Sequence, residues 1–276
     1  MYNSVLQMAV VFAATAIAYI SIIEGNPLPV LRKILSEKTF AVYLVIMFGV
    51  IGIDVIELNL ERVLKSSVTW DFTIPIFRLE GGLTEVLQKV FHNELLTHLT
   101  VFFYVFVFPV LVWVAMAVFN RHGNKNMLKK LLLVFVLNYV IALPFYLLFP
   151  VNEAWYSGTG VELLIRSVYP AFETQYRSLS GLNNCFPSLH TSLSISVALL
   201  SIHSGYKRLA LVMSASSAVI VFSTLYLGIH WFADVTGGMV AAMVAVNFAI
   251  VWVDGTVPVI ARLRQVLNIL NKQGEM

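Results

Sequence analysis

The chain has 276 residues and a formal net charge of +3. Hydrophobic residues make up 59% of it and charged residues only 12%, whereas soluble domains are about 25% charged. This composition excludes an ordinary soluble domain, and the small net charge gives no reason to expect nucleic acid as a partner.

Seven apolar stretches follow one another along the chain. A helix that crosses a bilayer needs about 20 consecutive apolar residues, and all but the short fifth stretch approach that length. A soluble protein of this size could not bury seven such segments. We therefore expect an all-α, polytopic membrane bundle of about seven transmembrane helices. The stretches span residues 4–23, 40–55, 97–119, 131–149, 189–202, 209–227 and 232–253.

The apolar stretches divide the chain into three parts. Residues 1–60 are expected to form an N-terminal transmembrane hairpin, residues 61–255 the core, and residues 256–276 a basic amphipathic tail on the cytoplasmic side. A solvated end without structure is an equal alternative for the tail. Between the second and third stretches, residues 83–96 place apolar side chains at helical spacing. This pattern predicts an interfacial helix on the membrane surface.

The positive charges predict an orientation. Most of the 18 lysines and arginines lie in the connections 24–39, 120–130 and 203–208 and in the C-terminal tail. Cytoplasmic loops carry an excess of these residues, so this side is expected to be cytoplasmic and the N-terminus outside. We expect an integral protein of the plasma membrane whose two sequence motifs, at the starts of the fifth and seventh stretches, lie on the extracytoplasmic face.

Two motifs carry the chemistry. The first, Pro-Ser-Leu-His, runs from Pro187 to His190, and the second runs from Ser223 through His230 to Asp234. Residues four apart share one face of a helix, so Asp234 can hold one ring nitrogen of His230 and leave the other free to react. His190 lies at an expected helix N-terminus, where amides and the helix dipole favour an anion. The motifs predict a phosphate site with two histidines and one carboxylate.

The motifs resemble the second and third signature motifs of the type-2 phosphatidic acid phosphatase superfamily, which includes vanadium haloperoxidases, lipid phosphatases and phosphotransferases. The resemblance covers about residues 70–250. Thr224 stands where the family usually has arginine, and the chain lacks the arginine-proline pair of the first family motif. Both departures are shared by a branch similar to the inositol phosphorylceramide synthases, which segments 77–81 and 147–151 also resemble.

The resemblance implies a role for each motif residue. His230 would be the nucleophile that forms a phosphohistidine, Asp234 would fix its tautomer, and His190 would be the general acid. A covalent intermediate with a positioned acid is one metal-free route for phosphoryl transfer. No cluster of acidic residues suggests a metal site, so we expect neither a metal nor a cofactor.

The phosphate must be held by other groups, because the usual family cations are missing and phosphoryl transfer depends on such charges. The candidates are the amides of Ser188, Leu189 and His190, the Ser188 hydroxyl, and Arg177 or Arg166 in the preceding loop. We place Arg177 first because it lies only ten residues before Pro187. An exposed arginine near lipid headgroups is an equal alternative.

The sequence thus predicts an enzyme that acts on a lipid phosphate, diphosphate or phosphodiester. Water as the acceptor would make it a phosphatase, and a polyol such as inositol or a sugar alcohol would make it a phosphotransferase that moves an inositol-phosphate-type headgroup. The missing arginine slightly favours the transferase. The alternative is a transporter or flippase that uses the histidines as a proton relay. Histidines near the surface and the lack of an inverted repeat argue against it. The oligomeric state is not predicted.

Overall fold

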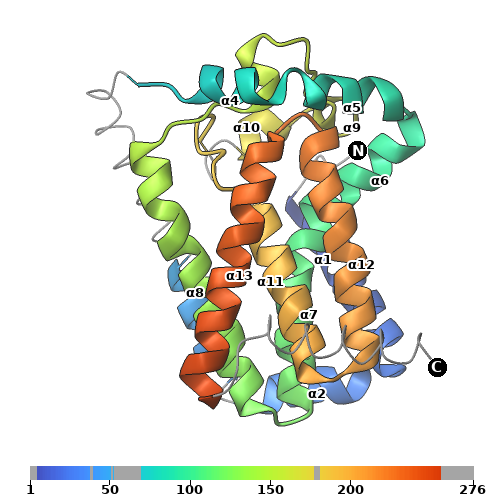
Figure 1. The fold of residues 1–276 in the computed structure, drawn as a ribbon. Coiled ribbons are helices and arrows are strands. Elements are labelled where there is room, and N and C mark those ends of the chain that lie inside the picture. Colours follow the sequence, from blue (N-terminus) through green and yellow to red (C-terminus); the bar gives the residue numbers. More distant parts are fainter. Residues whose placement is uncertain (1–4, 38–39, 51, 53–69, 177–180, 256–276) are drawn as a thin grey trace, which may run out of the picture.

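A computed structural model describes residues 5–37, 40–50, 52, 70–176 and 181–255. These residues form a bundle of helices (Figure 1). The only pairing of β type within this part of the chain is an isolated bridge between Val151 and Asn184. The predicted all-α class is therefore confirmed.

Five helices among the described residues are long and apolar enough to cross a membrane, which identifies an integral membrane protein. Two further apolar stretches are also helical but shorter, at Phe40–Val50 and in α11 (Leu189–Ser204). Each of the seven expected stretches therefore contains a helix, although the end of the second lies outside the described residues. The five are α1 (Val5–Glu24), the continuous helix made of α6 (Glu94–Phe102), η1 (Phe103–Val107) and α7 (Phe108–Arg121), α8 (Lys125–Leu148), α12 (Lys207–Tyr226) and α13 (Phe232–Asp254).

Short helices cover the two ends of the bundle. Figure 1 shows α4 (Thr73–Glu80) and α5 (Leu83–Phe91) running across one end, and α2 (Leu28–Ser36) lying at the other. Left-handed Gly81 and Gly82, with φ of 61° and 84°, separate α4 from α5, a conformation that glycine adopts without a Cβ penalty. Three further short helices lie in the connection after α8, namely η2 (Ala154–Ser157), α9 (Ile165–Val168) and α10 (Phe172–Tyr176).

The interfacial helix expected over residues 83–96 is not continuous, because residues 92 and 93 lie outside helical structure. Helix α5 ends at Phe91, and Asn93 then caps a new helix by accepting the Leu96 amide at 3.1 Å. The predicted end of the helix was wrong because Asn93, a favourable N-cap residue, was placed inside it.

Helix α11 occupies the centre of the bundle, where it packs against α7, α8, α12 and α13 (Figure 1). Its buried face carries Ser192, Ser196 and Ser201, and small residues let membrane helices approach closely. The Ser201 hydroxyl donates to the Val197 carbonyl at 2.7 Å, so its polarity is satisfied within the helix. A short, small-residue helix can therefore serve as the centre of an apolar bundle.

A side-chain amide fixes the long loop that follows α8 to the end of α12. Gln88 of α5 donates to the carbonyls of Glu162, at 2.7 Å, and Tyr226, at 2.9 Å, while its oxygen accepts the Glu162 amide at 2.9 Å. The turn after α12 contains Gly228, where a Cβ would lie 2.3 Å from the Glu162 carbonyl oxygen. These contacts determine where the chain enters the segment that contains His230.

Candidate active site

His230 and Asp234 form a buried pair at the start of α13. Nδ1 of His230 lies 3.3 Å from Oδ2 of Asp234, and the side chains are 7% and 0% exposed. The same carboxylate oxygen accepts the Trp231 amide at 2.9 Å. Trp231 is the N-cap residue of α13, where amides lack acceptors within the helix. Asp234 therefore caps its own helix and contacts the imidazole with one oxygen.

The main chain of Thr224 holds His230 in place. The Thr224 carbonyl accepts the amides of Ile229, at 3.3 Å, and His230, at 3.0 Å. Its hydroxyl donates to the Val221 carbonyl at 2.8 Å and is buried. At the position where the resemblance has arginine, this chain therefore has a side chain that bonds to its own helix.

His190 lies in the first turn of α11 between two aromatic rings. The Tyr104 ring is 4.1 Å from the imidazole centroid and within 10° of parallel, and the Phe108 ring is 4.0 Å away at 32°. The centroids of His190 and His230 are 6.5 Å apart. One phosphate group can contact two rings at this separation. Sequence analysis did not identify Tyr104 or Phe108, and their spacing of four residues gave no sign of which helix they face.

The two motifs are joined directly through Ser188. Its amide donates to the Asp234 carbonyl at 3.1 Å, and its hydroxyl oxygen accepts the Thr191 amide at 3.3 Å as the N-cap of α11. A Cβ at Gly238 would lie 2.6 Å from the Ser188 carbonyl oxygen. The close approach of α13 to the start of α11 therefore depends on this glycine.

The predicted phosphate ligands differ in where the structure places them. The Ser188 amide is bonded to Asp234, whereas the amides of Leu189 and His190 begin α11, where N–H groups have no acceptor within a helix. Nη2 of Arg166 lies 3.2 Å from Glu173, and its Cζ lies 4.4 Å from the Trp155 ring centroid.

These contacts hold the Arg166 guanidinium against the loop that carries it. Arg177, our first choice from the sequence, lies outside the described residues.

Three side chains at the site could contribute ligands to a metal ion. Ligand atoms of Cys185, His230 and Asp234 lie within 4.8 Å of one another, and thiolate, imidazole and carboxylate are typical zinc ligands. The buried Cys185 thiol donates to the Ile229 carbonyl at 3.5 Å. A metal here would occupy the His230 imidazole, which the sequence predicts to be free to react.

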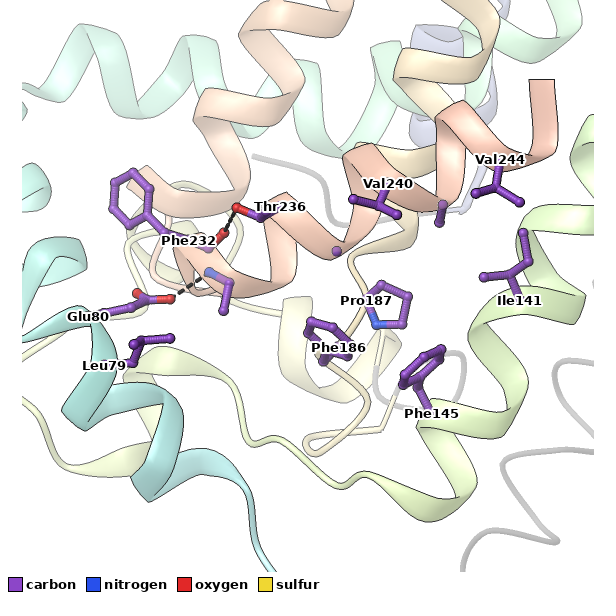
Figure 2. A pocket seen from close by; sticks show the side chains of 13 residues that line it. Leu79, Glu80, Ile141, Phe145, Phe186, Pro187, Phe232, Thr236, Val240 and Val244 are labelled. Atoms are coloured by element: carbon purple, nitrogen blue, oxygen red, sulfur yellow. Dashed lines mark hydrogen bonds between the residues drawn. The ribbon is translucent and has the colours of Figure 1, made fainter. Parts of the chain in front are cut away.

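An apolar groove of about 610 Å³ borders both motifs (Figure 2). Phe186 and Pro187, just before the α11 cap, line it together with the first turns of α13 and side chains of α8. At one end, Glu80 accepts the Ala233 amide at 2.6 Å. Neither His190 nor His230 lines this groove. Its wall consists of Leu79, Glu80, Ile141, Phe145, Phe186, Pro187, Phe232, Ala233, Thr236, Gly237, Val240, Ala241 and Val244.

An all-α membrane bundle with two histidines and a carboxylate at the starts of two neighbouring helices defines a narrow class of protein. The family model of the PAP2 superfamily matches residues 78–248, which is more than half of the chain and contains both motifs. The chain belongs to the PAP2 superfamily. Its members are phosphatases and phosphotransferases, which gives the general enzyme class. Neither a search of curated proteins nor a search of solved structures found a match.

Proposed function

We propose that this protein is a metal-independent lipid phosphatase or phosphotransferase that works through a phosphohistidine on His230. The observation that carries the proposal is the buried His230–Asp234 pair, at 3.3 Å, with a second histidine ring 6.5 Å away. An imidazole held by a carboxylate at one nitrogen presents the other nitrogen as a nucleophile or base.

In the first step, Nε2 of His230 attacks phosphorus, and the bond from phosphorus to the leaving oxygen breaks. His190 donates a proton to that oxygen, while Asp234 balances the positive charge on the phosphorylated imidazole. In the second step, the acceptor oxygen attacks phosphorus, His190 removes the acceptor's proton, and the P–N bond breaks. Both histidines return to their starting states, so the cycle needs no other reactant.

The groove supports a lipid as the substrate. It lies in a bundle of membrane-spanning helices, and its lining is almost wholly apolar from Phe232 to Val244 along α13. At a rise of 1.5 Å per residue this is a length of about 18 Å, which suits a hydrocarbon chain. A lipid held there would approach the proposed catalytic residues from the membrane, past Phe186 and Pro187 at the start of the first motif and Phe232 and Ala233 of the second.

We further propose that the active site faces the extracytoplasmic side of the plasma membrane and that the phosphate contacts the first amides of α11. Arg177 or Arg166 would supply the positive charge that the family arginine supplies elsewhere. The two motif departures favour a polyol or sugar-alcohol acceptor over water, as in enzymes similar to the inositol phosphorylceramide synthases. A diester substrate carries less charge per phosphorus, and a less cationic pocket suffices for it.

The direct test uses the purified full-length protein with candidate lipid phosphates, diphosphates and phosphodiesters, each with and without free inositol or glycerol. Release of inorganic phosphate would support the phosphatase, and a new phosphodiester lipid would support the transferase. Rapid quenching with labelled substrate should trap acid-labile phosphohistidine in the wild type and none in His230→Ala.

His98→Ala is the matched control, because the His98 ring is exposed and bonds to the Glu94 carbonyl of its own helix. Full activity in His230→Ala would refute the mechanism. Movement of lipid across the membrane without chemical conversion would favour the transporter instead.

A further inference from the structure

The helix Glu94–Arg121 contains a π-helical turn, η1, that ends two residues before Pro109. Proline has no N–H, and its ring clashes with the carbonyl four residues earlier, which here belongs to Val105. The wider turn accommodates this, and the Phe108 amide bonds to the Phe103 carbonyl five residues back. Such π-turns often occur at functional sites.

This turn presents two aromatic rings to the same imidazole. Tyr104 lies within η1 and Phe108 directly after it, and their rings cover the His190 ring at 4.1 Å and 4.0 Å. Phe106, which is as deeply buried as Tyr104, instead contacts Phe102 at 5.9 Å. The ring contacts with His190 are made by one residue of the turn, Tyr104, and by the residue that follows it, Phe108.

We propose that Tyr104 and Phe108 are positioning residues that hold His190 for proton transfer to the leaving oxygen, an inference that rests on the proposed function. With both faces covered, the imidazole can rotate little and presents its nitrogen-bearing edge. Fixing a reacting group in this way removes orientational freedom before the reaction.

A general acid matters most when the leaving group is a poor one. The test therefore compares octyl phosphate, whose alkoxide leaves poorly, with p-nitrophenyl phosphate, whose phenolate leaves well, both in detergent micelles with the full-length enzyme. Phe108→Leu and Tyr104→Leu should lower kcat/KM for octyl phosphate, which reports only the steps up to departure of the leaving group, about 10²-fold, in the range of general acid catalysis. They should leave kcat/KM for p-nitrophenyl phosphate nearly unchanged, because its phenolate leaves readily without an acid. Tyr104→Phe, which keeps the ring, should retain activity on both.

Phe106→Leu is the matched control, since it removes a buried ring from the same turn that packs against Phe102. It should not alter the ratio of the two rates. Equal losses on both substrates in Phe108→Leu and Tyr104→Leu, in step with the folded fraction, would overturn the inference and leave only a packing role.

The His190→Ala variant separates the two proposals. If it selectively loses kcat/KM for octyl phosphate while the aromatic variants do not, the positioning inference fails and the proposed function stands. If His190→Ala shows no dependence on the leaving group, or the wild type turns over neither ester, the proposed role of His190 fails and this inference fails with it.

Discussion

Asp234 contacts His230 with the same oxygen that caps its own helix: Oδ2 lies 3.3 Å from His230 Nδ1 and 2.9 Å from the Trp231 amide. The position of His230, the proposed nucleophile, and the start of α13 are therefore set by one carboxylate. Any change in this side chain acts on both, which makes the choice of substitution important.

Asp234→Asn is expected to lower kcat steeply while the protein remains folded. The amide oxygen can still accept the Trp231 N–H, but it carries no negative charge to balance the imidazolium and no longer fixes the tautomer. By analogy with other carboxylate–histidine pairs, we expect a loss on the order of 10³- to 10⁴-fold. Steady-state kinetics together with a thermal unfolding curve will check this. A large drop in Tm that accounts for the lost activity would contradict it.

Gly238→Ala should weaken the joint between α13 and α11. The new Cβ would lie 2.6 Å from the Ser188 carbonyl oxygen, and backbone cannot move aside cheaply. We expect a destabilisation of about 1–3 kcal/mol, typical of overpacking, and reduced turnover because Ser188 is bonded to Asp234. Gly49→Ala is the control, since nothing lies within 4 Å of the added Cβ. Equal stability of the two variants would show that the contact is not needed.

We expect Glu80 to make the free energy of unfolding depend on pH. Burial raises the pKa of the Glu80 carboxyl above its ordinary value of 4.5. The folded protein then binds more protons than the unfolded one, so this contribution is fully present below 4.5 and is lost as pH rises through the folded-state pKa. Glu80→Gln should flatten that decline and still accept the Ala233 amide. Unfolding in detergent across this pH range will test it, and an unchanged slope would exclude Glu80 as the cause.

Lys130, His203 and Asp254 form a charged cluster at the other end of the bundle. Nζ of Lys130 lies 3.1 Å from His203 Nε2 and also contacts Asp254, and the lysine side chain is 4% exposed. Asp254→Asn removes the negative charge that contacts both Lys130 and His203. Because breaking a buried ion pair costs about 3–5 kcal/mol, we expect the free energy of unfolding to fall by this order.

The double variant Lys130→Met with Asp254→Leu should recover much of this loss, because neither charge is left alone. Lys129→Met, at the exposed neighbouring lysine, should change little. Denaturation in detergent will rank the variants. A double variant no more stable than Asp254→Asn would show that the charges themselves matter.

The orientation can be tested by thiol labelling on a Cys185→Ser background. Tyr156 is 54% exposed at the end that carries the motifs, and His122 lies at the opposite end of the bundle, after α7. Tyr156→Cys should react with a membrane-impermeant maleimide in intact cells, and His122→Cys only after permeabilisation. The reverse pattern would place the site in the cytoplasm.

Local patterns in the sequence predicted the parts of this protein that depend on local spacing. The apolar stretches marked the long helices, and the four-residue spacing of His230 and Asp234 anticipated their contact. The rings around His190 could not be predicted, since Tyr104 and Phe108 lie more than eighty residues away in the sequence and meet it only through tertiary packing. The end of α5 was missed although Asn93 carried a readable capping signal.

The amide of Gln88 has a consequence for how this chain can vary. Its nitrogen donates to two carbonyls and its oxygen accepts one amide, so neither a carboxylate nor an apolar side chain can satisfy all three groups. Gly228 leaves room for the same loop. Both residues contact Glu162 in the loop between η2 and α9. Among relatives, we therefore expect positions 88 and 228 to change together, and only where this loop also changes.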